Sequence, residues 1–252
     1  MSLLGVSFAM IFKSSLSRST RSKLLGVFAL ASAILALKTT YLSAKDASPA
    51  VVRNSNDKAV SIPNLAATDW KVLFNEKDLA GWIQKNGWAN YRIVDGTVEG
   101  TTNDKSPNSF LCTAESYSNF EFTVEVKCDP SLNSGIQIRS ASDPNIAGGH
   151  VYGPQIEIAT QVSGYIYGEG TDRGWLSPSQ ELHNHFKNED WNQYVIRANG
   201  KRLQTWINGK LIEDITDAIG ADSGFIGLQV HSINQGSGPF KVQWRNIRIR
   251  PL

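Results

Sequence analysis

Five polar residues of this chain alternate with apolar residues in a way that would place them on one face of a β-sheet. In a strand, residues i and i+2 share a face, so Ile136 and Ile138, if buried, leave the polar residues beside them pointing away from the core. The segments 155–158 and 228–231 alternate in the same way. The polar residues expected to point away from the core are therefore Arg139, Gln155, Glu157, Gln229 and His231. Amide, carboxylate, guanidinium and imidazole groups form hydrogen bonds with sugar hydroxyls. We therefore expect these five side chains to converge on one pocket.

Aromatic residues accompany this polar set. Tyr165 and Tyr167 share one face of a short strand, and Trp175 follows in a glycine-rich loop. Because ring faces pack on the apolar surfaces of sugars, Tyr167 and Trp175 are expected to line the same groove. The alternative is the ordinary solvated face of a half-exposed sheet, which also carries polar residues. The combination of Gln, Arg and His with Tyr and Trp favours the groove, since it is rich in directional hydrogen bonding.

Other kinds of catalytic site find less support. The segment His183-Asn184-His185 places two imidazoles on one side if it is extended and could ligate a metal, but such a segment alone is more typical of a surface loop. The sequence has no GxSxG, P-loop or GxGxxG motif, which argues against serine hydrolase chemistry, NTP hydrolysis and dinucleotide binding. It also lacks the Glu-x-Asp-x-x-Glu motif that a jelly-roll retaining glycosidase would carry.

The elements that must position these residues are strands. Apolar and polar residues alternate repeatedly beyond residue 69, and we find no long stretch with a helical period after Ala44. Asp95-Gly96, Asn199-Gly200 and Asn208-Gly209 are expected at hairpin tips, because these dipeptides accept positive φ angles. Residues 191–215 then form a three-stranded meander. We predict an all-β domain of about 12 strands, folded as an antiparallel two-sheet jelly-roll sandwich.

Residues 1–44 have the pattern of a signal peptide. Basic residues at 18, 21 and 23 precede an apolar run over 24–37, and small residues follow at Ser43 and Ala44. This run is shorter than the roughly 20 residues of a membrane span. We therefore expect export to the periplasm or the extracellular space, with cleavage near Ala44. The alternative is an uncleaved signal anchor, and only then would the membrane be a partner.

The charge of the chain separates the leader from the rest. The 25 Lys and Arg residues exceed the 23 Asp and Glu residues, but five of the basic residues precede residue 45, which leaves 20 basic and 23 acidic groups beyond it. The folded part has no basic block to neutralise phosphates, so nucleic acid is not an expected partner. Residues 45–68 are polar, contain two prolines and have no sustained period, so we interpret them as a linker to a domain at 69–252.

The two cysteines are expected to be buried free thiols. Cys112 and Cys128 lie in strand-like runs joined by a short connection. A hairpin of that kind would place Cys112 opposite a residue near 120, far from Cys128. A disulfide is permitted in an oxidising compartment but is not implied by this spacing.

Several motifs occur in an order that resembles the 3-keto-disaccharide hydrolase family, formerly a domain of unknown function. They include LFNEKDLAGW (73–82), NSGIQIR (133–139), GPQIEI (153–158), WNQYVIRANGKRLQTWINGK (191–210), SGFIGLQVH (223–231) and VQWRNIRIR (242–250). The resemblance covers about residues 69–252. It implies a concanavalin A-like jelly roll, frequent export and, for members with known activity, cleavage of glycosides that carry a ketone at C3 of the sugar.

The resemblance also implies roles for the polar set. A C3 ketone acidifies the C2 proton, so a base can form an enediolate that expels the C1 substituent, after which water adds. His231 is the first candidate for proton transfer because imidazole titrates near neutral pH; Glu157 is the second, as base or metal ligand. Arg139 and Gln155 would hold substrate oxygens or the enediolate, and Gln229 would orient a hydroxyl. A divalent cation is implied as a Lewis acid in some members, and no organic cofactor is expected.

Carbohydrate is thus the expected partner, and three functions remain open. The first is an exported enzyme that cleaves glycosidic bonds of 3-keto-disaccharides or related oxidised glycosides. The second is a non-catalytic, lectin-like carbohydrate-binding module that uses the same groove. The third is a cell-surface interaction domain tethered by its uncleaved leader.

Overall fold

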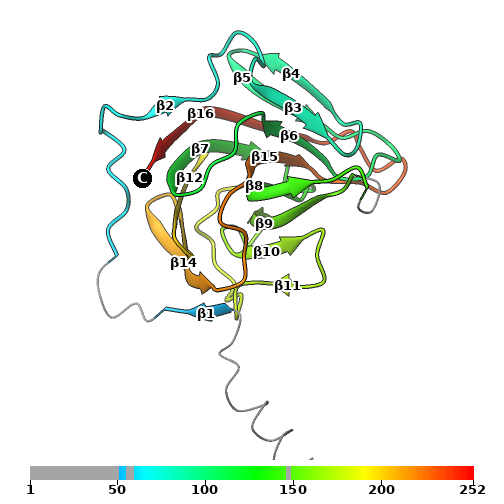
Figure 1. Cartoon of the computed structure of the whole chain (residues 1–252). Coiled ribbons are helices and arrows are strands. Elements are labelled where there is room, and N and C mark those ends of the chain that lie inside the picture. Colours follow the sequence, from blue (N-terminus) through cyan, green and yellow to red (C-terminus); the bar gives the residue numbers. More distant parts are fainter. Residues whose placement is uncertain (1–50, 55–59, 146–148) are drawn as a thin grey trace, which may run out of the picture. The chain divides into compact units, whose positions relative to one another are not determined.

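The computed structural model describes residues 51–54, 60–145 and 149–252 of the 252-residue chain. Within these residues the chain is all-β, with two antiparallel sheets packed face to face (Figure 1) and no helix, as the alternation predicts. No helix able to cross a membrane is found in the described part of the chain.

Sheet A has nine strands, ordered β1-β14-β13-β12-β7-β16-β5-β4, with β2 paired to β16. These strands are β1 (Val51–Arg53), β2 (Lys71–Val72), β4 (Asn90–Val94), β5 (Thr97–Thr101), β7 (Phe120–Cys128), β12 (Asn192–Asn199), β13 (Arg202–Ile207), β14 (Lys210–Asp217) and β16 (Lys241–Pro251). Sheet B has seven strands, ordered β11-β10-β9-β8-β15-β6-β3. Its strands are β3 (Trp82–Lys85), β6 (Ser109–Thr113), β8 (Ser134–Ser142), β9 (Val151–Ile158), β10 (Ile166–Glu169), β11 (Gly174–Trp175) and β15 (Phe225–Val230).

The core lies between the two sheets. On β7, Phe122 and Val124 are fully buried on the inner face, in the phase that the alternation predicts. On sheet B, the fully buried Ile136, Ile156 and Leu228 belong to the same core cluster. Because neighbouring residues of a strand face opposite ways, this packing turns the alternate residues of β8, β9 and β15 to the outer face of sheet B.

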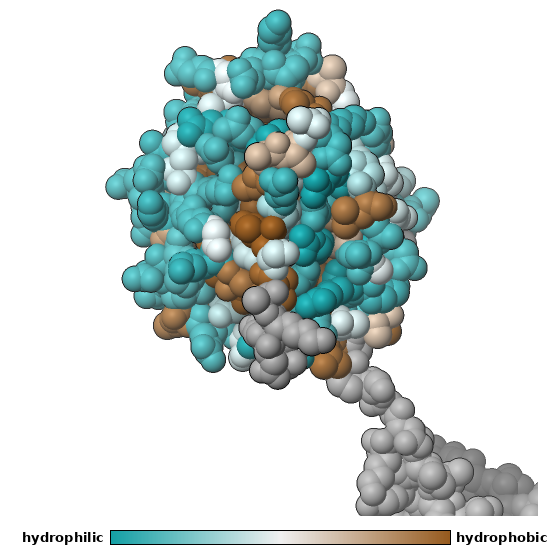
Figure 2. All heavy atoms as spheres, turned by 90° about the vertical axis from the view of Figure 1, so that its left-hand side faces the viewer, coloured by the Kyte–Doolittle hydropathy of each residue, from teal (hydrophilic) through white to brown (hydrophobic). Residues whose placement is uncertain are grey.

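Part of the predicted linker at 45–68 is packed on the domain. Residues 51–53 form β1, which pairs with β14 at the edge of sheet A. Further along, the Ser61 carbonyl accepts a hydrogen bond from Arg197, and Asp69 pairs with Arg250, both on the outer face of sheet A. Figure 2 shows this side of the molecule as mostly hydrophilic, with scattered apolar side chains. The predicted signal peptide at 1–44 lies outside the described residues.

The meander at 191–215 is confirmed, and one of its two turns differs in detail from the prediction. Asn208 and Gly209 form the tip between β13 and β14, both with positive φ angles. In the β12–β13 hairpin, however, Asn199 pairs with Arg202, so the tip is Gly200–Lys201. Only Gly200 has a positive φ there. This conformation needs glycine in the first turn position. The turn therefore lies one residue later in the chain than the predicted Asn199-Gly200.

Both cysteines are buried and free, as expected, but for a different reason. The predicted hairpin between their strands does not form, because β6 belongs to sheet B and β7 to sheet A. The connection between them crosses from one sheet to the other. Burial raises the pKa of each thiol to about 12, so neither is poised as a nucleophile.

Candidate functional site

Four neighbouring strands of sheet B align a row of side chains across its outer face. Trp175 of β11 lies opposite Tyr167 of β10, Tyr167 lies opposite Gln155 of β9, and Gln155 lies opposite Gln137 of β8. The Tyr167 and Trp175 rings meet edge to face with centroids 5.4 Å apart, and Trp175 is 41% exposed. The structure thus brings the two aromatic residues beside the amides, as the alternation suggests.

The amides and the carboxylate of this face form one directed chain of hydrogen bonds. Ser140 Oγ donates to Gln137 Oε1 (2.6 Å), Gln137 Nε2 donates to Gln155 Oε1 (2.8 Å), and Gln155 Nε2 donates to Glu157 Oε1 (2.7 Å). Asn133 Nδ2 donates to the second oxygen, Glu157 Oε2 (3.2 Å). We call these five residues the polar array. Each residue of the chain donates a hydrogen bond to the next, and the chain ends at Glu157. The carboxylate of Glu157 therefore accepts two N–H donors, one from Gln155 and one from Asn133.

A glycine makes room for the centre of the polar array. Gly135 lies opposite Glu157 in the β8–β9 register, and its φ angle is not in the left-handed region. A β-carbon at this position would lie 2.6 Å from Gln155 Cγ and 2.8 Å from Gln155 Nε2. The absence of a side chain therefore lets Gln155 lie flat across β8 and reach Glu157.

The carboxyl of Glu157 is held in a poorly solvated place. Burial, with a smaller contribution from the charge of Glu169, raises the pKa of Glu157 to about 7, although the hydrogen bonds from Gln155 and Asn133 act in the opposite direction. Desolvation dominates because the residue is only 6% exposed. A carboxylate with this pKa is partly ionised at neutral pH and is basic enough to accept a proton from carbon acids activated by a carbonyl group.

This shift makes a prediction for stability. The pKa of Glu157 is higher in the folded protein (about 7) than its ordinary value of 4.5, so the folded state holds the proton more tightly than the unfolded state. The stabilisation from this group is complete below about pH 4.5 and is lost as pH rises through about 7. Urea unfolding from pH 4.5 to 8 should show a free energy of unfolding that falls with rising pH in the wild type, and this contribution should be missing in Glu157→Gln. The same dependence of the free energy of unfolding on pH in the two proteins would mean that Glu157 has an ordinary pKa.

A hydrogen-bonded bridge crosses the outer face of sheet B. Asn108 Nδ2 donates to Glu169 Oε1 (2.8 Å), and Asn108 Oδ1 accepts from the Ser232 amide (2.9 Å). Asn108 precedes β6 and Glu169 ends β10, and three strands lie between β6 and β10 in the sheet. Since the inner face is filled by the core, the bridge passes over the outer face. The charge of Glu169 contributes to the raised pKa of Glu157.

His231 lies at the end of β15, two residues beyond Gln229 on the same phase. It is half-buried, and its Nδ1 is 2.7 Å from the Ser232 carbonyl oxygen. Because a carbonyl only accepts, Nδ1 must carry the proton in this contact, and Nε2 is the ring nitrogen that this contact leaves free. The Ser134 hydroxyl donates to the Gln229 carbonyl (2.6 Å), so the end of β15 lies beside Asn133, which contacts Glu157.

Arg139 does not join the polar array. A bulge shifts the β8 register between Gln137 and Ala141, and Arg139 adopts a positive φ of 45°. Its guanidinium donates to the Ser118 and Gly200 carbonyls (2.7 and 2.6 Å), and so ties two loops at one end of the sandwich. The expectation that Arg139 shares the face of Gln137 is therefore corrected, because the extra residue of a bulge interrupts the two-residue period. Ser140 takes that place on the outer face.

Three members of the polar array are not among the predicted site residues. Gln137 lies between the buried Ile136 and Ile138, so the alternation of apolar and polar residues is enough to place it on the outer face. Ser140 follows the bulge and Asn133 precedes β8, and neither position can be assigned to the outer face from a two-residue period. Only the pairing of β8 with β9 identifies them.

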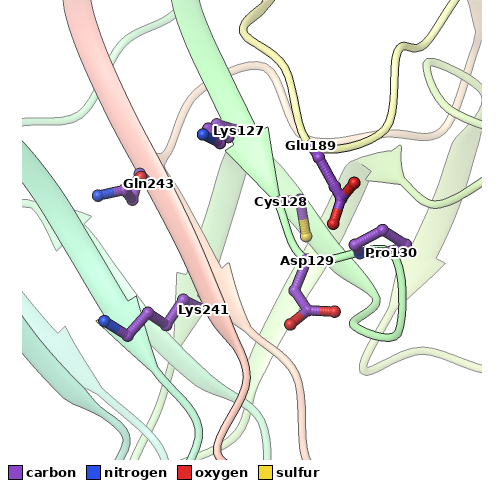
Figure 3. A pocket seen from close by; sticks show the side chains of 7 residues that line it. All are labelled: Lys127, Cys128, Asp129, Pro130, Glu189, Lys241 and Gln243. Carbon is purple, nitrogen blue, oxygen red and sulfur yellow. The ribbon is translucent and has the colours of Figure 1, made fainter.

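Two cavities elsewhere offer less chemistry. One has a volume of about 250 Å³ and is lined by Cys128 together with Lys127, Lys241, Asp129 and Glu189. Figure 3 shows the two acidic side chains near Cys128 and the two lysine side chains pointing away from its thiol. The other, of about 360 Å³, is lined by the segment at 181–185 together with β1 and β14.

The His183-Asn184-His185 segment does not form a metal site in the described part of the chain. His183 Nε2 contacts the Ser163 carbonyl (2.9 Å), and His183 Nδ1 accepts a hydrogen bond from the His185 amide (3.3 Å). Both ring nitrogens of His183 are thus occupied. No group of three or more His, Cys, Asp or Glu residues placed to hold a metal occurs among residues 51–54, 60–145 and 149–252.

Comparisons with known proteins agree with this architecture. A family model described as a 3-keto-alpha-glucoside-1,2-lyase-like domain matches residues 69–250. A putative glycosyl hydrolase from Parabacteroides distasonis ATCC 8503 is 18% identical and superposes with a TM-score of 0.55, covering 73% of this chain and 94% of that chain. The β-glucanase of Bacillus licheniformis is 12% identical, with a TM-score of 0.53 and coverages of 77% and 100%.

A carbohydrate-binding module from Bacillus subtilis is 16% identical, with a TM-score of 0.50 and coverages of 68% and 95%. A comparison with curated proteins gave no match. At these identities the likeness to solved structures concerns the fold, and it confirms the predicted two-sheet jelly roll.

Proposed function

Because this chain belongs to the 3-keto-alpha-glucoside-1,2-lyase-like family, we propose that it cleaves glycosidic bonds of 3-ketoglycosides and that Glu157 is the base. The observation that carries this proposal is the state of Glu157: a buried carboxylate with a pKa of about 7, fixed by two amide donors on the outer face of sheet B. The family supports a carbohydrate as the ligand.

The chemistry needs one base and one acid. Glu157 removes the proton on C2, and the electrons of the C2–H bond are delocalised onto the C3 oxygen as an enediolate. These electrons then form the C1–C2 double bond as the C1–O bond breaks, and the departing oxygen takes a proton from the acid. This elimination completes a 1,2-lyase reaction, and addition of water across C1–C2 would complete hydrolysis. A base with a pKa near 7 suits the first step, because it is strong yet ionised at neutral pH.

We assign the acid role to His231. Its Nε2 is left for the substrate by the contact of Nδ1 with Ser232, and in the imidazolium form this nitrogen carries the proton that passes to the departing oxygen. Tyr167 and Trp175 would pack on the sugar rings at the more exposed side of the row. Export is also part of the proposal, since residues 1–44 have the signal-peptide pattern.

The residues present do not form a preformed metal site. Glu157 is the only carboxylate of the polar array, and both of its oxygens accept amide hydrogen bonds. The proposed elimination uses only side chains of this protein. A divalent cation that enters with the substrate remains part of the proposal, because the family resemblance implies one.

The direct test is an assay of the full chain on a disaccharide and on its 3-keto derivative, each with and without added divalent cation. We expect sugar release from the keto derivative alone, because only a C3 ketone makes the C2 proton acidic. The matched control is the same keto compound after reduction back to the alcohol, which should be inert. Binding of both compounds without release of sugar would instead support a lectin-like module. Cleavage of the unoxidised disaccharide would contradict the elimination route.

A further inference from the structure

Among the described residues, Gln229 is the one amide of the outer face of sheet B without a hydrogen-bond partner. The side chain is fully buried, and neither Oε1 nor Nε2 has a partner within the described part of the chain. Gln137 and Gln155 make their side-chain hydrogen bonds within the polar array and none to Gln229. A buried polar group without a partner destabilises the protein that carries it. A ligand that reaches such a group can complete its hydrogen bonding.

The register places Gln229 one strand away from Glu157. Leu228 pairs with Ile136, so Gln229 comes opposite Gly135, and Gly135 pairs with Glu157 on its other side. Adjacent strands lie about 4.8 Å apart, so the two backbones are separated by about 10 Å. The Gln155 side chain lies over Gly135 between them, so a sugar that contacts both the base and the amide would lie above Gln155. On the far side of Gln229 lies the apolar Phe110 of β6.

Resting on the proposed function, we infer that Gln229 recognises the α-hydroxyketone of the oxidised sugar. A carboxamide presents one donor and one acceptor side by side, and an α-hydroxyketone presents the complementary pair. Gln229 Nε2 donates to the C3 oxygen, and Gln229 Oε1 accepts from the hydroxyl on C4. When Glu157 removes the C2 proton, negative charge develops on the C3 oxygen, so the hydrogen bond from Nε2 strengthens in the transition state.

The test combines stability with ligand preference. Gln229→Leu removes the unpartnered amide and should raise the melting temperature of the ligand-free protein by about 2–6 °C. Gln204→Leu is the matched control, because Gln204 is also buried but donates to Asp214 (3.0 Å), and its loss should lower the melting temperature. On a 3-keto disaccharide, Gln229→Leu should lower kcat/KM by about 10²-fold.

Gln229→Glu separates the ketone from the alcohol. A carboxylate accepts from the hydroxyls of the parent disaccharide but repels a ketone oxygen. Calorimetry in the Glu157→Gln background should show at least about tenfold weaker binding of the 3-keto disaccharide, with a smaller effect on the parent compound. Equal effects on both ligands, or a lower melting temperature for Gln229→Leu, would overturn the inference. Wild-type protein that binds but does not cleave the keto compound would overturn the proposed function alone, since the binding preference is read without turnover.

Discussion

Glu157→Gln should lower kcat on a 3-ketoglycoside by about 10²–10⁴-fold, the usual contribution of a general base. The substitution keeps the shape of the side chain but removes the group that takes the C2 proton. In the wild type, kcat/KM should rise with pH through about pH 7, because Glu157 must be ionised to act and its pKa is about 7. Steady-state kinetics between pH 5 and 9 provide both measurements.

Two matched variants make this result specific. Glu125→Gln changes the same residue type on the outer face of sheet A and should leave kcat unchanged. His231→Ala removes the proposed acid, so it should slow glycosides with poor leaving groups more than those with acidic leaving groups, whereas Glu157→Gln should slow both equally. Full turnover in Glu157→Gln, with the wild-type pH profile retained, would exclude Glu157 as the base.

Phe122→Ala should lower the free energy of unfolding by about 3–5 kcal/mol, the range for truncating a buried phenylalanine. Phe122 is fully buried on β7, between Ile196 of β12 and Ile249 of β16. Removing the ring leaves a cavity at the centre of sheet A that neighbouring strands cannot fill without breaking their pairing. This loss is a large part of the roughly 5–15 kcal/mol that stabilises a typical domain.

Urea unfolding monitored by tryptophan fluorescence measures this change. Ile83→Ala is the control, because Ile83 is 50% exposed on the edge strand β3 and its truncation should cost about 0.5 kcal/mol or less. A loss for Phe122→Ala as small as that of the control would contradict the packing described for the core. The same experiment at several pH values also supplies the stability profile expected from Glu157.

Local alternation along the chain was sufficient to predict which residues of β9 and β15 face outward. Gln155, Glu157 and Gln229 lie on the outer face of sheet B because the isoleucines and leucines beside them are buried in the core. The turn at Asn208-Gly209 and the all-β class follow from equally local rules, since positive φ angles and the two-residue period depend only on adjacent residues. The order of the motifs along the chain likewise predicts the family, which the family model confirms over residues 69–250.

Which outward residues meet was decided only by the tertiary structure. The bulge at Arg139 turns its guanidinium to the end of the sandwich, and the separation of β6 and β7 into different sheets removes the hairpin expected around the cysteines. The hydrogen bonds that join Gln137 to Gln155, and the bridge from Asn108 to Glu169, connect residues 18 and 61 positions apart. Strand order and register arise from packing of the whole core, so the burial that raises the pKa of Glu157 and isolates Gln229 has no local signature in the sequence.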